Sequence, residues 1–134
     1  MMIDGGCHCG EITYRAEIDP EAVSICHCTD CQTLSGSPYR VSVVADRDRV
    51  TVSAGEPALY VKTADSGRKR LQYFCRTCGS PLFTTGEGEQ ADRWGIRWGS
   101  IRQRSELRPS KQIWCRSAAP WTADIADLPA SPQR

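Results

Sequence analysis

The chain has 134 residues, which is enough to bury a hydrophobic core without the help of a partner. Hydrophobic residues make up 40% of it and charged residues 25%, the proportions of an ordinary globular protein. The net charge of +1 provides no basic surplus of the kind that releases counterions from a polyanion, so the composition argues against a nucleic-acid partner.

No targeting or membrane segment is recognisable in the sequence. Residues Met1–Gly6 lack the basic and apolar regions of a signal peptide. No apolar stretch reaches the length that a bilayer requires. We therefore expect a cytoplasmic protein with no membrane partner, in a reducing compartment where clustered cysteines favour metal binding over disulfides.

Short β-strands separated by turns are the main secondary structure that the sequence predicts. The predicted strands are Glu11–Arg15, Tyr39–Ala45, Val50–Val52, Leu59–Lys62, Leu71–Phe74, Leu82–Thr84, Trp94–Trp98 and Gln112–Trp114. The polar segment Asp46–Arg49 predicts a hairpin between the strands that flank it, and Asp65–Gly67 predicts a turn. This spacing of strands and turns is typical of an all-β sandwich or barrel-like fold.

Helix is scarce in the prediction. One short helix begins with Thr29 or Asp30 as its cap and ends before Ser35–Pro38. A second helical turn is expected near Ser105–Leu107, and the proline-rich tail Leu128–Arg134 is expected to be frayed. We predict a single domain over residues 1–134 that is mainly β with little helix, with its core over about residues 5–122.

Seven of the eight cysteines fall into tight groups along the chain. The groups are Cys7 with Cys9, Cys26 with Cys28 and Cys31, and Cys75 with Cys78. Because a closed tetrahedral zinc site takes four ligands, seven thiols suggest one complete site and one site with three ligands.

The two paired groups resemble each other, because each pair is followed directly by a glycine that can relieve strain behind a tight turn. We call Cys7, Cys9, Cys75 and Cys78 the four-cysteine cluster and Cys26, Cys28 and Cys31 the three-cysteine cluster. The four-cysteine cluster predicts a structural zinc site, since four thiolates leave no free position on the ion. An ion held by the three-cysteine cluster would keep one position for water or a substrate thiol.

Other ligand sets remain open at this point. Cys115 could supply a fourth sulfur to the three-cysteine cluster, and His8 or His27 could supply a nitrogen. The groups could also pair differently, and iron could replace zinc in a thiolate cage. A closed second site would make the protein a non-enzymatic zinc module that binds a protein partner.

The order of these motifs resembles a known family. The matching segments are Gly6–Ile12, Cys26–Gln32, Phe74–Phe83, Gly99–Ile101 and Pro120–Trp121. Together they resemble the glutathione-dependent formaldehyde-activating enzyme (GFA) family, which includes the centromere protein V group. The likeness extends over roughly residues 5–122, and Phe74–Phe83 is its most specific part.

The resemblance implies an antiparallel, zinc-stabilised β domain of the β-tent type. It also implies that the four-cysteine cluster holds a structural zinc ion and that the three-cysteine cluster, Cys26, Cys28 and Cys31, holds a catalytic one. The implied activity is that of a carbon–sulfur lyase, in which glutathione or another thiol and formaldehyde or a related aldehyde form an S-hydroxymethylglutathione-like adduct. Candidates for binding the carboxylates of glutathione are Arg40, Arg68, Arg70 and Arg97, although each is also explained as an ordinary surface arginine.

Overall fold

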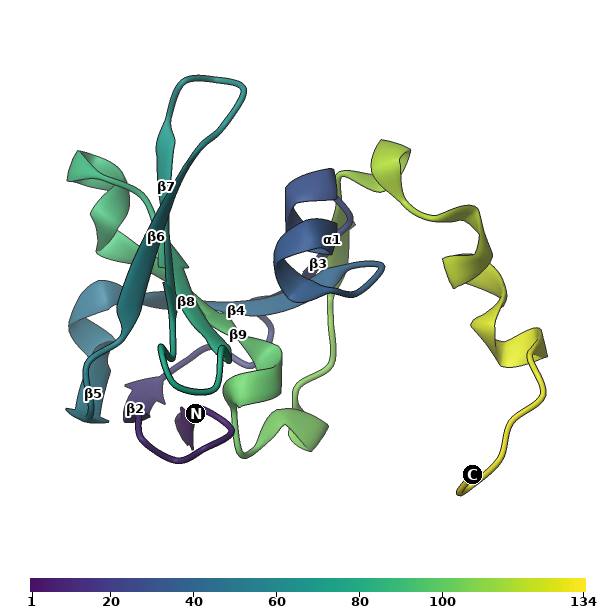
Figure 1. Ribbon diagram of the computed structural model, residues 1–134, viewed down its shortest axis with the longest axis horizontal. Helices are drawn as coiled ribbons and strands as arrows, with labels where there is room; N and C mark the ends of the chain where they lie inside the picture. Colours follow the sequence, from purple (N-terminus) through teal and green to yellow (C-terminus); the bar gives the residue numbers. More distant parts are fainter.

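The computed structural model describes residues 1–134 as a mainly β protein with little helix, as the sequence predicts (Figure 1). Its strands are β1 (Met2–Gly6), β2 (Thr13–Glu17), β3 (Val23–Cys26), β4 (Arg40–Asp46), β5 (Val50–Ala54), β6 (Ala58–Thr63), β7 (Lys69–Phe74), β8 (Pro81–Thr85), β9 (Arg93–Arg97) and β10 (Lys111–Ile113). The α-helix is α1 (Thr29–Ser35), and the 3-10 helices are η1 (Arg47–Arg49), η2 (Gly88–Asp92), η3 (Trp98–Ser100), η4 (Arg104–Glu106), η5 (Cys115–Ser117) and η6 (Pro120–Asp127). No helix is long and apolar enough to span a bilayer.

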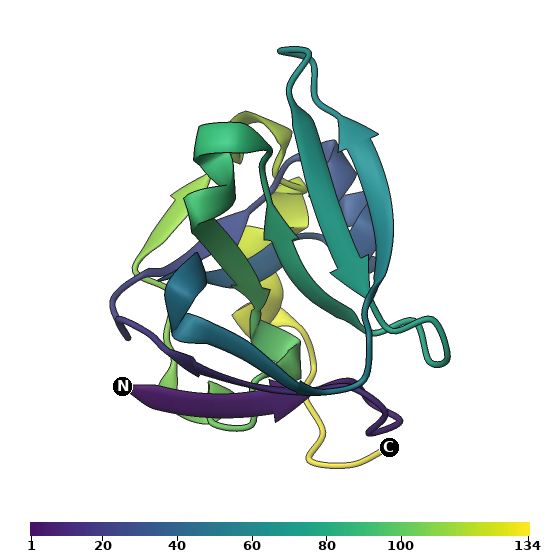
Figure 2. The same cartoon turned by 90° about the vertical axis from the view of Figure 1, so that its left-hand side faces the viewer.

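The strands form two sheets. A three-stranded sheet has the order β1-β2-β5, and a seven-stranded sheet has the order β10-β3-β4-β9-β8-β7-β6. Neighbouring strands are antiparallel except at one edge, where β10 runs parallel to β3. In Figure 2, β1 lies along the edge of the smaller sheet, near the start of the chain.

The sequence predicts a hairpin across Asp46–Arg49, and this prediction is wrong. Strands β4 and β5 flank this segment, but they belong to different sheets, because β5 pairs with β2 and β4 pairs with β3 and β9. The segment forms η1, which carries the chain from one sheet to the other. In contrast, β6 and β7 pair directly across the predicted Asp65–Gly67 turn.

Two strands are absent from the prediction, β1 and β3. The first ends in Gly5-Gly6, and glycine has low strand propensity. Close backbone approach explains these glycines, because a Cβ on Gly5 would lie 2.2 Å from the Ser100 oxygen and one on Gly6 would lie 2.4 Å from the Ile12 oxygen. The second is only four residues long and runs into the cysteine motif at Cys26, which hides its alternation.

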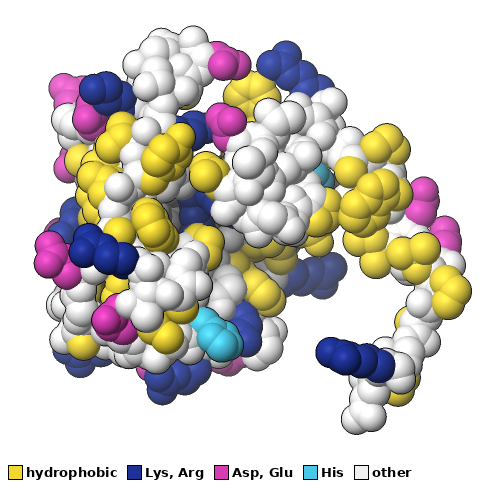
Figure 3. All heavy atoms as spheres, in the orientation of Figure 1, with side chains coloured by type: hydrophobic (Ala, Val, Ile, Leu, Met, Phe, Trp, Pro, Cys, Tyr) yellow, Lys and Arg dark blue, Asp and Glu magenta, His cyan; other side chains and the backbone are white.

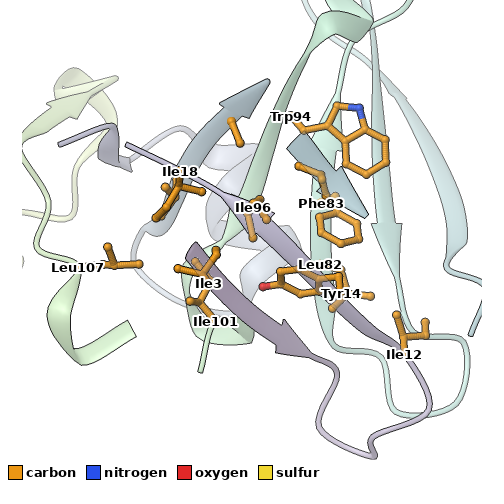
Figure 4. Packing of buried hydrophobic residues seen from close by; sticks show 14 of the residues in the cluster. Ile3, Ile12, Tyr14, Ile18, Leu82, Phe83, Trp94, Ile96, Ile101 and Leu107 are labelled. Atoms are coloured by element: carbon orange, nitrogen blue, oxygen red, sulfur yellow. The ribbon is translucent and has the colours of Figure 1, made fainter. Parts of the chain in front are cut away.

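The hydrophobic core lies between the two sheets. The smaller sheet contributes alternate residues such as Ile3 and Tyr14, and the larger sheet contributes Phe83, Trp94 and Ile96. Phe83 lies at the centre of this packing, with its ring edge-on to Tyr14 at 4.9 Å and tilted against Trp94 at 5.1 Å (Figure 4). Such aromatic pairs contribute stability beyond the area they bury.

The C-terminal segment lies apart from this core. After β10 the chain continues through η5 and η6, which extend away from the sheets in Figure 1. Trp121, Ile125 and Leu128 are all largely exposed there. Residues 128–134 are exposed as well, and fraying of this tail stays a prediction.

Replacement of Phe83 by alanine should lower the free energy of unfolding by about 3–5 kcal/mol, because the cavity would lie between both sheets. Denaturant unfolding of the metal-loaded protein measures this change. Leu59→Ala is the control, since Leu59 is 48% exposed and its truncation should cost less than about 1 kcal/mol. Equal losses in the two variants would contradict the central position of Phe83.

Candidate metal centres

The first cysteine turn follows β1. Cys7 is buried, and the Gly10 N–H donates to its carbonyl oxygen at 3.2 Å, which closes the turn around Cys9. Gly10 has a φ of +84°, the left-handed conformation that side chains disfavour. The Ile12 N–H donates to the Cys7 sulfur at 3.2 Å and so orients it toward the turn.

The second cysteine turn follows β7 and has the same construction. The Gly79 N–H donates to the Cys75 carbonyl oxygen at 2.8 Å, and Gly79 has a φ of +79°. The Ser80 hydroxyl, and then its backbone N–H, stabilise the Cys78 thiolate and lower the pKa of this thiol to about 5. The His8 N–H donates to the Ser80 hydroxyl at 2.9 Å, which links the two turns.

The two turns bring the thiols of the four-cysteine cluster together. Their four sulfurs lie within 4.8 Å of one another. The Cys7 and Cys9 sulfurs are 3.6 Å apart, and those of Cys9 and Cys75 are 3.8 Å apart. Sulfurs at the corners of a tetrahedron around a zinc ion, each about 2.3 Å from it, would be separated by roughly 3.8 Å. These side chains therefore fit a four-coordinate ion.

The three-cysteine cluster lies at the junction of β3 and α1. Cys26 ends the strand, Cys28 is the N-cap of the helix, and Cys31 is in its first turn. The Cys28 sulfur accepts the Cys31 N–H at 3.3 Å, so the cap is Cys28 and not the predicted Thr29 or Asp30. The three sulfurs lie within 4.8 Å of one another.

The thiols of this cluster influence each other's ionisation. A hydrogen bond with Cys31 lowers the pKa of Cys26, and the same bond together with burial raises the pKa of Cys31. Without a metal ion, ionisation of the Cys26 thiol therefore disfavours ionisation of the Cys31 thiol. A cation would remove this competition, which makes the cluster suitable for a metal ion. The structure thus contains two groups of thiols that can each hold an ion.

The three other candidate ligands lie outside the group of side chains that can share an ion with the three-cysteine cluster. Cys115 is exposed and begins η5. The His27 ring is buried, its Nε2 lies 2.8 Å from the Gln112 Oε1, and its edge packs against Tyr39. His8 is exposed and contacts the second cysteine turn through its backbone. The group therefore consists of Cys26, Cys28 and Cys31 alone.

A cavity of about 600 Å³ borders the three-cysteine cluster. Cys26 and Cys31 both line it, together with residues from the sheet and from the β6–β7 hairpin. Figure 3 shows basic side chains in the hollow between this hairpin and α1. The volume lies within the range of small-molecule sites, about 300–1,000 Å³.

Three of the four candidate arginines line this cavity, namely Arg40, Arg70 and Arg97, whereas Arg68 is exposed in the β6–β7 turn. Burial, with Arg40 nearby, lowers the pKa of Arg97 to about 9, and burial also lowers the pKa of Arg40 and of Arg70. The sequence prediction does not include Gln72, whose amide binds two of these arginines. Its position between Leu71 and Tyr73 in β7 is the only sign of it in the sequence.

Comparison with known proteins adds a family and a fold. A family model described as glutathione-dependent formaldehyde-activating enzyme matches residues 2–117. No curated protein matches the sequence. Among solved structures, a Rhodobacter sphaeroides protein from a structural genomics programme matches with a TM-score of 0.64 and 19% identity, over 82% of this chain and 99% of that chain. At this identity the likeness concerns the fold.

Cys115→Ser should leave the metal content of the purified protein unchanged, because its sulfur is not part of either group. Cys78→Ser should lower the metal content of the soluble fraction by at least one ion per chain and should also destabilise the fold, because it removes one of the four ligands that join the two cysteine turns. Elemental analysis of proteins purified without chelator measures both. Loss of an ion in the Cys115 variant would show that this thiol is a ligand after all.

Proposed function

The chain belongs to the glutathione-dependent formaldehyde-activating enzyme family, and we propose that it is a zinc-dependent carbon–sulfur lyase-like enzyme. Its substrates in this proposal are a thiol such as glutathione and formaldehyde or a related small aldehyde. The product is an S-hydroxymethylglutathione-like adduct, and the reverse reaction cleaves it.

A single observation carries the proposal. The three-cysteine cluster offers three thiols, without a fourth ligand from the chain, and two of its members line a cavity of about 600 Å³. An ion held by these residues would face the cavity with one free position. Such an arrangement suits a small substrate, whereas a purely structural site would be closed by a fourth side chain.

The choice of zinc rests on the donor set. Both clusters consist of thiols alone, and thiolates favour zinc among the common divalent ions of proteins, with iron as the other candidate. In this proposal, Cys7, Cys9, Cys75 and Cys78 hold a structural zinc ion and Cys26, Cys28 and Cys31 hold a catalytic one, so each chain contains two. When bound, the catalytic zinc would supply a position at which a thiol ionises near neutral pH.

The proposed reaction needs neither an oxidant nor a leaving group. The thiol sulfur adds to the carbonyl carbon, so that one carbon–sulfur bond forms and the carbon–oxygen double bond becomes single. The proton of the thiol ends on the new hydroxyl oxygen. The cavity beside Cys26 and Cys31 holds the two reactants together, and this proximity lowers the entropic part of the barrier.

Cys31→Ser should lower the rate of adduct formation by more than about 100-fold, because loss of a partner that only supports a ligand already costs about 10- to 100-fold. Magnetisation-exchange NMR between free glutathione and its formaldehyde adduct measures the rate. Cys115→Ser is the matched control, since it changes an exposed thiol outside both clusters and should retain the activity. An inactive wild-type protein with two zinc ions bound would favour a non-enzymatic zinc module instead.

The two clusters should also differ in their effect on folding. Cys75→Ser should unfold or aggregate the protein, because the binding free energy of a structural zinc ion contributes directly to folding. Cys31→Ser should remain folded and lack one ion. Circular dichroism melting with metal analysis tests both variants, and equal unfolding of the two would refute the separate roles.

A further inference from the structure

The C-terminal arm, by which we mean residues 118–128, exposes three large hydrophobic side chains. Trp121, Ile125 and Leu128 are 55%, 45% and 60% exposed. Figure 3 shows hydrophobic side chains gathered on this arm, and Figure 1 shows α1 between the arm and the sheets. The last hydrogen bond that joins the chain end to the rest of the protein runs from the Gln32 Nε2 to the Ser117 carbonyl oxygen at 3.0 Å. A group of apolar side chains exposed to water in this way marks an interaction surface.

The arm combines this apolar character with negative charge. Its three hydrophobic residues recur every three to four positions along η6 and its cap, and Asp124 and Asp127 lie between them. Neither carboxylate belongs to any of the five ion pairs in the structure. No lysine or arginine occurs between Arg116 and Arg134. A partner surface for the arm should therefore be apolar and positively charged.

The β6–β7 hairpin has two different faces. Directly paired residues share one face of a hairpin, and successive pairs alternate between the two faces. Lys62, Arg70 and Gln72 line the cavity beside the three-cysteine cluster, so one face is turned toward that cavity. The opposite face, which we call the outer face, consists of the pairs Leu59–Tyr73, Val61–Leu71 and Thr63–Lys69.

The outer face is apolar and has a basic end. Strand β6 is the last strand of the large sheet, and Leu59 and Val61 are 48% and 42% exposed. Soluble proteins normally cover such an edge or protect it with charge. Lys69 is exposed at the end of this face, and neither it nor Arg68 in the adjoining turn forms an ion pair. The outer face thus has the properties that the arm requires of a partner.

A second copy of the chain can bring these two surfaces together. Within one copy, the arm and the hairpin lie on opposite sides of α1, so the arm does not cover its own outer face (Figure 1). In a pair of chains related by a two-fold axis, each copy contributes one arm and one outer face, and the contact forms twice and closes. This doubling matters because a stable interface buries about 800 Å² on each partner.

We propose that the protein forms a two-fold dimer in which the arm of each copy docks on the outer face of the other. The apolar side chains of the arm pack against Val61 and Leu71, and Asp124 and Asp127 lie near Lys69. Since the other face of the hairpin borders the cavity, the dimer also holds the hairpin beside the three-cysteine cluster. The proposal concerns assembly and is independent of the proposed reaction.

Sedimentation equilibrium of the metal-loaded full chain tests the proposal, and the wild-type protein should have twice the mass of one chain. Val61→Lys and Ile125→Lys should each raise the Kd of the dimer at least about 10-fold, because each puts a charge in place of an apolar contact. Met2→Lys is the matched control and should retain the wild-type Kd, since Met2 is 65% exposed and lies outside both surfaces.

Charge reversal tests whether the arm meets the outer face. Lys69→Glu should weaken the dimer, and addition of Asp124→Lys and Asp127→Lys should restore it, because opposite charges then face each other again. Melting temperatures check the folding of each variant, and Leu59→Lys replaces Val61→Lys if the latter does not fold.

Three results would overturn the proposal. The first is a wild-type chain that remains monomeric at about 100 μM, a concentration well above the Kd of a stable dimer. The second is a dimer that persists in Ile125→Lys, which would mean that the outer face pairs with itself or that other surfaces form the contact. The third is failure of the two arm substitutions to restore the dimer of Lys69→Glu.

Discussion

The meeting of two cysteine turns, one after β1 and one after β7, is the constraint on which the rest of the structure depends. The sulfurs of Cys9 and Cys75 are far apart in the sequence and 3.8 Å apart in space. The chain between them forms a long loop that contains six strands and the α-helix. Closure of such a loop costs chain entropy, so an ion that binds both turns would stabilise the fold by restricting the unfolded chain. The closure also brings the connection between β1 and β2 in the small sheet against the connection between β7 and β8 in the large one.

The three-cysteine cluster differs in that its members lie close together in the sequence. Its thiols come from one short segment, so the local junction of β3 and α1 is enough to bring them together. Folding adds the cavity and the arginines that line it. Burial of unpaired guanidinium groups costs stability, and the lowered pKa of Arg97 reflects this cost. Such costs are commonly concentrated at functional sites, where a ligand offsets them.

The strands that the sequence predicts correctly are those whose pattern is local. Strands β6 and β7 are adjacent in the chain and pair across a turn that contains Gly67, so their residues suffice to predict them. The segment Asp46–Arg49 is also polar but contains no glycine, and it does not join a hairpin. The difference is non-local, because β4 is held between β3 and β9 and leaves no free edge for β5. The polarity of a connecting segment alone cannot distinguish these two outcomes.

The sequence by itself determined the candidate ligands, because the C-x-C and C-x-x-C spacings, with a glycine after each of the two pairs of the four-cysteine cluster, bring thiols together through local backbone geometry. It also determined the mainly β character, through short alternating runs of residues. Only the tertiary structure decided which side chains surround the three-cysteine cluster. It places Cys115 outside the cluster and brings Arg40, Gln72 and Arg97 together from β4, β7 and β9. Pairing between strands that are distant in the chain sets these contacts, and local sequence patterns do not encode it.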